Sequence, residues 1–215
     1  MAFNPPPTLL EKVMRFRAIQ HKDGKVLLHG IPVLLALFSS NAYQQRLLEH
    51  LYGKKAACEV IYGIGKFQAG QGTKIINKRF GYADKIKDIK KIMEFNLNQT
   101  EVVGAGKLKW IKVDFDNQIF IVKGDSTFAR EYKKLFGLTS YPVDYFLGGC
   151  IAGGLEVVLN KKMFCDEIKC IAQGDPTCIF IIRPVEKWDK KILKKRFIED
   201  IPSLKELGAK LPCLY

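Results

Sequence analysis

The chain has 215 residues, 47% of them hydrophobic, and a formal net charge of +13 at pH 7. This length suits one large domain with appendages and can bury a substantial core. No run of about 18 apolar residues occurs, so we expect no membrane span. Six cysteines in a chain of this length do not make a disulfide scaffold. The N-terminus lacks the basic-then-apolar order of a secretory signal, so we predict a cytoplasmic protein.

The positive charge raises the question of nucleic-acid binding. The lysines are spread along the chain, with local clusters at residues 85–91 and 187–196. In both clusters the lysines alternate with apolar residues at helical spacing, which is typical of a solvated helix face. No recognition-helix motif or RNA-binding aromatic signature is present. We therefore expect that nucleic acid is not a partner.

The first half of the chain predicts a strand region followed by helices. Residues 1–8 are rich in proline and predict a flexible arm. Residues 25–38 are apolar and interrupted by glycine and proline, so they predict one or two strands that lead into a helix. Helices are then predicted at 39–52 and 54–77, with Gly53 between them as a candidate C-cap. In the second helix Ala57, Val60, Ile61 and Ile64 share one face.

The second half alternates helices with short strands. A basic helical tail is predicted at 187–215, so we expect a single domain over residues 9–186. Within it, a helix is predicted at 84–97, two or three strands are predicted among 101–104, 107–114 and 118–123, and helices are predicted at 128–136 and 142–159.

The most informative stretch is FCDEIKCIAQGDPTCIFII, residues 164–182. Its Gly-Asp-Pro turn between two short β-branched runs predicts a hairpin. Two residues separate Glu167 from Cys170, and seven separate Cys170 from Cys178. These three residues supply ligands for a borderline-soft divalent cation, and zinc is the usual occupant of such thiolate sites. The alternative is that the cysteines of this stretch are buried as small hydrophobic side chains.

The segment CIAQGDPTCIF, which follows Glu167, resembles the C-terminal signature of the 4-vinyl reductase domain family. Residues 24–70 resemble the N-terminal half of the sensor domain of xylene- and phenol-responsive bacterial activators. Together these resemblances cover roughly residues 24–184. They imply an α/β (α+β) ligand-binding domain, in which helices pack on a mainly antiparallel sheet and a metal anchors the C-terminal hairpin. Subunits of the TRAPP vesicle-tethering complex share this fold.

The resemblance also implies a fourth zinc ligand, a cysteine in a Pro-Val-Cys-aromatic context. Here that context reads Pro-Val-Asp-Tyr, so the position falls on Asp144. Aspartate ligates zinc at about 2.0–2.2 Å, and the site can therefore survive the change. Cys165 and then Cys150 are the alternatives for the fourth position, and a site that binds no metal is the remaining outcome. The predicted metal ligands are Asp144, Glu167, Cys170 and Cys178.

The resemblance further implies a small pocket lined by the second helix, the third strand and the glycine-rich helix. The candidate pocket residues are Phe67, Phe120, Val122 and Leu147, with the alternative that these side chains belong to the core. We expect a non-catalytic sensor or regulatory domain with structural zinc, which binds a small hydrophobic or aromatic ligand. It would act as a homodimer and pass its signal to a separate partner protein.

Two other functions compete with this expectation. One is an assembly or adaptor subunit of the TRAPP type, without ligand. The other is a tetrapyrrole vinyl reductase, as the family name implies. We disfavour the reductase because the sequence has no nicotinamide or flavin motif. Its histidines, His21, His29 and His50, also lie far upstream of the cysteines in sequence.

Overall fold

The structure is a computed structural model that describes residues 19–28, 31–33, 36–80, 89–189 and 192. Two compact units, residues 1–37 and 38–215, make up the chain. The predicted arm and most of the predicted basic tail lie outside the described residues. The predicted domain boundaries stay a prediction.

The first unit contains a small antiparallel sheet with the order β1-β2-β3. Its strands are β1 (Ile19–Lys22), β2 (Lys25–Leu28) and β3 (Ile31–Val33). Asp23 and Gly24 join β1 to β2, and both have positive φ angles, 50° and 71°. Asp-Gly is a favoured pair for such a two-residue hairpin turn because it tolerates this left-handed backbone.

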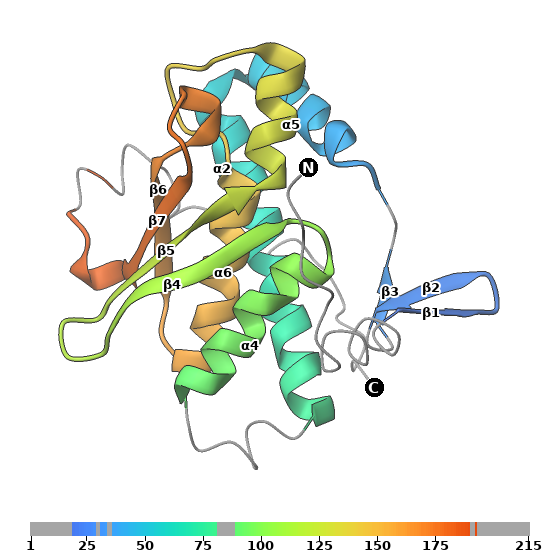
Figure 1. Cartoon of the computed structure of the whole chain (residues 1–215), viewed down its shortest axis with the longest axis vertical. Coiled ribbons are helices and arrows are strands. Elements are labelled where there is room, and N and C mark those ends of the chain that lie inside the picture. The colour runs from blue at the N-terminus through green and yellow to red at the C-terminus, as the bar shows by residue number, and fades with distance from the viewer. Residues whose placement is uncertain (1–18, 29–30, 34–35, 81–88, 190–191, 193–215) are drawn as a thin grey trace, which may run out of the picture. The chain divides into compact units, whose positions relative to one another are not determined.

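The second unit packs helices on a four-stranded antiparallel sheet with the order β4-β5-β7-β6 (Figure 1). The predicted α+β fold is therefore confirmed. Strand β7 of the β6–β7 hairpin lies beside β5, and β4 and β6 form the two edges of the sheet. The elements are α2 (Phe38–Phe80), α4 (Ile89–Val102), β4 (Gly106–Asp114), β5 (Ile119–Ser126), α5 (Thr127–Phe136), α6 (Tyr145–Leu159), β6 (Met163–Lys169), the 3-10 turn η1 (Ile171–Gln173), β7 (Cys178–Pro184) and the 3-10 turn η2 (Val185–Lys187).

Helix α2 is two helical segments joined at a kink. The backbone leaves helical geometry at Gly53, where φ is 80° and ψ is 157°. A residue with a side chain rarely adopts this φ, so glycine fits the break. The predicted boundary between two helices at Gly53 is confirmed.

Glycines allow α2 and α6 to pack backbone against backbone. A Cβ atom added at Gly149 would collide with the carbonyl oxygen of Tyr62, and one at Gly153 would collide with that of Lys66. From the other side, a Cβ at Gly65 would collide with the carbonyl oxygen of Phe146. Helix α6 also contacts β6. The glycine-rich sequence of α6 therefore serves close packing, which fixes α2 next to the β6–β7 hairpin.

One predicted strand is wrong. A strand is predicted at residues 101–104, but Glu101 and Val102 form the last residues of α4. The buried positions Met93 and Leu97 keep this helix on the core for another turn. The helix then ends before Gly104, whose φ is 78°.

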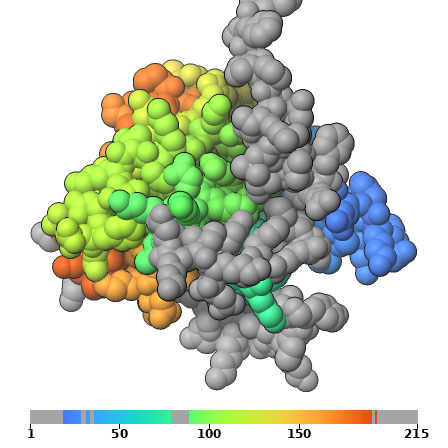
Figure 2. Space-filling view, turned by 60° about the horizontal axis from the view of Figure 1, so that its bottom comes forward, coloured from blue at the N-terminus to red at the C-terminus, as the bar shows by residue number. Residues whose placement is uncertain are grey.

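The remaining elements follow the predictions closely. The strands predicted at 107–114 and 118–123 correspond to β4 and β5, and β4 forms part of the surface in Figure 2. Ser126 caps α5 by accepting a hydrogen bond from the backbone N–H of Ala129 at 3.3 Å. None of the helices in the described part of the chain has the length and hydrophobicity needed to span a bilayer.

Candidate metal centre and adjoining cavity

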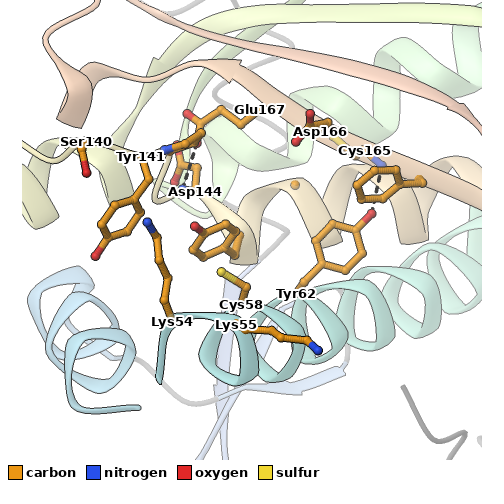
Figure 3. A pocket seen from close by; sticks show the side chains of 14 residues that line it. Lys54, Lys55, Cys58, Tyr62, Ser140, Tyr141, Asp144, Cys165, Asp166 and Glu167 are labelled. Carbon is orange, nitrogen blue, oxygen red and sulfur yellow. Dashed lines mark hydrogen bonds between the residues drawn. The ribbon is translucent and has the colours of Figure 1, made fainter. Parts of the chain in front are cut away.

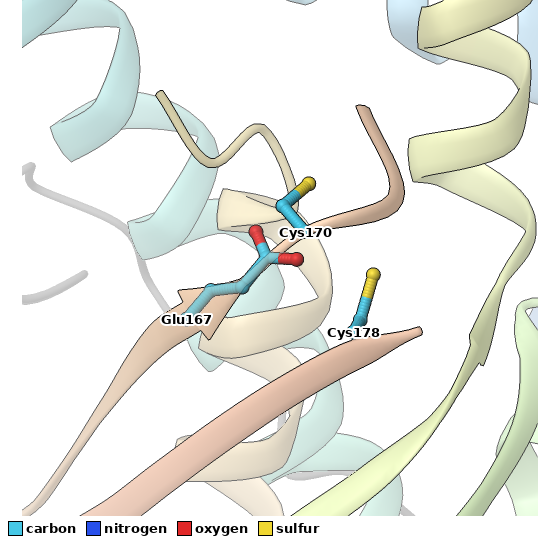
Figure 4. Close-up of side chains that lie close together, drawn as sticks. All are labelled: Glu167, Cys170 and Cys178. Atoms are coloured by element: carbon cyan, nitrogen blue, oxygen red, sulfur yellow. The ribbon is translucent and has the colours of Figure 1, made fainter. Parts of the chain in front are cut away.

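The β6–β7 hairpin brings three potential metal ligands together. Glu167 lies on β6, Cys170 precedes η1, and Cys178 begins β7. All three are buried, and their ligand atoms lie within 4.8 Å of one another (Figure 4). The turn between them is held by Asp175, whose Oδ2 accepts a hydrogen bond from the Cys170 N–H at 3.0 Å. A tight turn thus converts residues up to eleven positions apart into one cluster.

Asp144 reaches the same cluster from the start of α6. Its backbone N–H donates to Glu167 Oε2 at 3.0 Å, and its Oδ2 accepts a hydrogen bond from Cys178 Sγ at 3.5 Å. Only 1% of its surface is exposed. Asp144, the first candidate for the fourth ligand, therefore contacts two of the other predicted ligands.

The two alternative cysteines lie differently. Cys165 is buried on β6, where its backbone N–H donates to the Tyr62 hydroxyl at 3.0 Å. Cys150 is half-buried on α6, and burial raises the pKa of its thiol to about 12. Like Asp144, neither belongs to the group of three clustered donors in the described part of the chain, but Asp144 alone of the three has a side-chain hydrogen bond to a member of it.

Unpartnered oxygens give a direct test of whether this cluster fits a cation. Asp144 Oδ1 and Glu167 Oε1 are buried and have no hydrogen-bond partner among the described residues. A buried carboxylate oxygen without a partner is unfavourable, because it has lost its hydration. A divalent cation bound by Glu167, Cys170 and Cys178 would supply a partner for Glu167, and Asp144, which accepts a hydrogen bond from Cys178, lies next to that group. Two thiolates and two carboxylates form a donor set that zinc accepts in tetrahedral geometry.

The pKa values of three groups in the cluster are raised, whereas that of Cys170 is lowered. Burial, together with the charge of Cys170, raises the pKa of Asp144 to about 7. Burial and the nearby Asp144 raise the pKa of Glu167. A hydrogen bond from Cys178 lowers the pKa of Cys170 to about 6, and the same bond raises the pKa of Cys178. Cation binding to the three groups with raised pKa values would therefore displace protons, whereas Cys170 favours the thiolate form that binds metals.

A cavity of about 470 Å³ adjoins the cluster (Figure 3). Its walls come from α2, from the loop before α6, from the first turn of α6 and from β6. Asp144 and Glu167 line the cavity as well as forming part of the cluster. Anything bound in the cavity would therefore lie next to two of the candidate metal ligands. The α2 wall carries Lys54, Cys58 and Tyr62, which are four residues apart and so share one helix face.

The cavity wall is tied to α2 through Tyr141. Its hydroxyl donates to Glu49 Oε2 at 2.8 Å, and the Tyr132 hydroxyl donates to the same oxygen at 2.7 Å. The Lys54 ammonium lies 3.1 Å from the centre of the Tyr141 ring. Glu49 precedes the kink at Gly53 and Lys54 follows it. Tyr141 therefore contacts both segments of α2.

The four predicted pocket residues lie elsewhere. Phe120, Val122 and Leu147 are fully buried in the core, whereas Phe67 is exposed on α2. None of them lines the cavity described above. Their role in a pocket stays a prediction. The lining residues of α2 were missed, although the four-residue spacing of Lys54, Cys58 and Tyr62 is visible in the sequence.

Comparison with known proteins connects this fold to a sensory domain. The structure is similar to the crystal structure of the phenol-responsive sensory domain of the transcription activator PoxR with phenol. The TM-score is 0.75 at 13% sequence identity, over 91% of this chain and 100% of that one. At this identity the likeness establishes the fold alone. The predicted resemblance to the phenol-sensor fold is confirmed.

Two further solved structures are more distant. A vinyl-4-reductase family protein from Methanocaldococcus jannaschii has a TM-score of 0.44 at 16% identity, over 71% of this chain and 83% of that one. A trafficking protein particle complex subunit 3 from Naegleria fowleri, covalently bound to palmitic acid, has a TM-score of 0.48 at 15% identity. That match covers 71% of this chain and 98% of the subunit.

Sequence relatives match only a segment of the chain. Two uncharacterised proteins of Methanocaldococcus jannaschii, MJ0745 and MJ1460, are 47% identical over 45 residues and 35% identical over 49 residues. These segments are 21% and 23% of this chain, and they span 25% and 30% of the relatives' own length. No protein-family model matches the chain.

Proposed function

We propose that the chain is a non-catalytic small-molecule-binding domain of a sensory or regulatory type. The observation that carries this proposal is the cavity of about 470 Å³, which has the size typical of small-molecule sites. It occurs in a fold like that of a phenol-responsive sensory domain. The aromatic side chains of Tyr62, Tyr141, Tyr145 and Phe164 line it, so the ligand is a small hydrophobic or aromatic molecule.

The proposed metal is a structural zinc ion held by Asp144, Glu167, Cys170 and Cys178. Four protein ligands complete a tetrahedral shell and leave no position for the water that a catalytic zinc requires. The ion would anchor the β6–β7 hairpin and the start of α6 to each other. Because Asp144 and Glu167 also line the cavity, the metal would keep that wall in place.

We propose that the domain acts as a homodimer through α2. Apolar side chains are exposed along this helix on both sides of the kink, and their spacing of three or four residues places neighbouring ones on one face. Rows of exposed apolar residues mark interaction surfaces. A signal from the dimer would pass to a separate partner protein. The exposed apolar residues are Tyr43, Leu47, Leu51, Val60, Ile64 and Phe67.

The same row favours the second candidate function, an assembly or adaptor subunit without ligand. In that case the row would bind another subunit and the cavity would stay empty of organic ligand. The two functions differ in one measurable property, which is whether the purified protein binds small apolar molecules.

The test is a thermal-shift screen of the metal-loaded protein with phenol, substituted phenols and larger aromatic compounds. A bound ligand raises the melting temperature in proportion to the logarithm of its concentration. The matched control is Gly148→Leu, which adds a side chain to the cavity lining at a position where a Cβ atom would make only ordinary van der Waals contacts. Stabilisation of the wild type but not of the control supports the sensor. A complete lack of stabilisation favours the assembly subunit.

A further inference from the structure

We propose that the outward face of the four-stranded sheet binds an acidic amphipathic helix of a separate partner protein. The helix would lay its apolar stripe on the isoleucines of β5 and β7, and its acidic side chains would meet the lysines of β4 and β5. This inference goes beyond the proposed function, because it concerns a surface that the small-molecule proposal does not use. Either can therefore fail while the other stands.

The two faces of the sheet differ in burial. On the face toward α4 and α6, the side chains of Phe120, Val122, Phe180 and Ile182 are fully buried in the core. Alternate residues of the same strands point to the opposite face. A solvated face of an antiparallel sheet normally carries polar residues there. Here the two central strands carry isoleucines, which mark the outward face as an interaction surface. These half-buried residues are Ile119, Ile121, Ile179 and Ile181.

Positive charges flank this apolar strip. Lys109 of β4 lies directly opposite Lys123 of β5, and the same row continues through Ile179 to Lys169 of β6. In the described part of the chain, neither Lys109 nor Lys123 has a hydrogen bond or an ion pair through its side chain. Like charges directly opposite each other on neighbouring strands are destabilising. An acidic side chain from a partner would relieve this repulsion.

The acidic residues of the outward face do not neutralise this pair. Asp125 is bound by Arg130, and Asp114 lies 3.3 Å from Lys112. Asp166 lies on the edge strand β6, where it lines the cavity. Basic residues exceed acidic ones on the face, so the partner that complements it is acidic. The outward charged residues of the strands are Lys107, Lys109, Lys112, Lys123, Lys169 and Arg183, with Asp114, Asp125 and Asp166.

The edges of the sheet favour a helix on the face over a strand added at the side. The pairing register shifts at Ile111 in β4 and at Ile168 in β6, and both isoleucines are 49% exposed. Bulges and edge lysines protect a sheet edge from strand pairing. Ile179 and Ile181 lie about 6.7 Å apart along β7. Residues four apart on a helix are separated by a similar distance, about 6 Å along its axis.

The same isoleucines argue against nucleic acid as the occupant. Proteins that bind single strands on a sheet stack the bases on aromatic side chains. The central strands offer no ring on the outward face, because their aromatic residues Phe120 and Phe180 are buried on the other one. A protein helix that carries both apolar and acidic side chains fits this face better.

The experiment selects binders from a phage-displayed library of random peptides of about 15 residues, which is roughly four helical turns. The full chain is the immobilised target. We expect the selected peptides to carry an excess of Asp and Glu, with apolar residues three or four positions apart. Synthetic copies of these peptides are then titrated with the wild type and with variants by fluorescence anisotropy. Their affinity should fall as salt is added.

Variants of the sheet assign the binding to this face. Lys109→Glu should weaken the selected peptides roughly tenfold, because it turns an attraction into a repulsion. Its melting temperature should not fall, since the change converts a like-charge pair with Lys123 into an opposite-charge pair. Ile181→Thr keeps a β-branched side chain but removes apolar surface, and it should also weaken binding. Lys133→Glu is the matched control, because it makes the same charge change at an exposed lysine of α5.

Each contrary outcome overturns the proposal. The selected peptides could lack an excess of acidic residues, or bind Lys109→Glu as tightly as the wild type. Equal losses in Lys109→Glu and Lys133→Glu would show an effect of net charge alone. A lower melting temperature of Lys109→Glu would give Lys109 a structural role instead. Binding to mixed phosphatidylserine–phosphatidylcholine vesicles without any selected peptide would make the face a membrane surface. None of these results affects the screen with phenols, which tests the cavity separately.

Discussion

The β6–β7 hairpin and the cavity wall adjoin each other but are built in opposite ways. The hairpin gathers Glu167, Cys170 and Cys178 from a short stretch of chain folded by one turn. The cavity draws its lining from two helices, a loop and a strand. A local cluster depends on a few specific side chains, whereas an assembled cavity depends on how its elements pack. The two regions should therefore respond to different kinds of mutation.

The largest expected effect comes from removing the thiolates. The double variant Cys170→Ala, Cys178→Ala should lose the bound metal and lower the melting temperature by roughly 10 °C or more, because structural metal binding contributes directly to folding. Metal content by mass spectrometry and calorimetry measure the two effects.

The matched control for this variant is Cys58→Ala, Cys150→Ala, which removes the same number of thiols outside the cluster. It should keep about one metal ion per chain. A well-folded wild type that contains no metal would contradict the metal centre and favour the assembly subunit.

The second effect tests the packing that supports the cavity. In Gly149→Ala the new Cβ collides with the carbonyl oxygen of Tyr62, so α6 must move away from α2. Overpacking of this kind costs about 1–3 kcal/mol of the free energy of unfolding. Gly72→Ala is the control, because its Cβ meets nothing within 4 Å. The control should stabilise the helix by up to about 1 kcal/mol in urea denaturation. Equal effects of both changes would contradict the close packing of α2 on α6.

Asp144 belongs to both regions, and its substitution should have an intermediate effect. Asp144→Asn removes the charge of one proposed ligand and should weaken zinc affinity by at least about 10-fold in a chelator competition, since even the loss of a group that only supports a ligand costs this much. Asp144→Cys supplies a thiolate at the same position and should restore tight binding with a preference for softer metals. Cys165→Ser is the control and should leave the affinity unchanged. A loss of zinc in Cys165→Ser would instead identify Cys165 as the fourth ligand.

The same contrast explains which features could be predicted from the sequence. The hairpin and its three donors were predicted because turn signals and ligand spacing are local, whereas Asp144 was predicted only from the resemblance to a known family. Apart from Asp144 and Glu167, the cavity lining was not predicted, because Tyr141 and Tyr62 line one cavity only after α2, α6 and the loop have packed. Their proximity depends on the close backbone packing of α2 on α6 at glycines. Which glycines face the other helix cannot be predicted from the sequence.

Helix α2 shows a further limit of periodicity. The four residues that share an apolar face in the sequence divide in the structure: Ala57 and Ile61 are buried, whereas Val60 and Ile64 are exposed. The apolar residues extend around the helix, so one pattern contains both a core face and an outer face. Hydrophobicity alone cannot distinguish a helix face that packs on the core from an exposed apolar face of the kind that marks interaction surfaces.

The smallest expected effect concerns the hydroxyl groups around Glu49, at the edge of the cavity wall. Burial, with the hydrogen bonds to Tyr141 and Glu49, raises the pKa of Tyr132 above its ordinary value of 10.0. A raised pKa in the folded state stabilises the fold below the unfolded pKa, and this stabilisation is lost as the pH rises above about 10. In Tyr132→Phe this part of the pH dependence disappears, and the lost hydrogen bond costs about 1 kcal/mol at neutral pH.

Urea denaturation at pH 8 and at pH 10.5 measures both parts of this prediction. The wild type should lose more stability than Tyr132→Phe between the two pH values. Tyr43→Phe is the control, because Tyr43 is exposed on the same side of the kink as Glu49 and should follow the wild type. An identical pH dependence in Tyr132→Phe and the wild type would show that the hydrogen bond from Tyr132 to Glu49 does not raise the pKa of Tyr132. The cavity wall would then rest on helix packing alone, whereas the hairpin would still depend on its metal ligands.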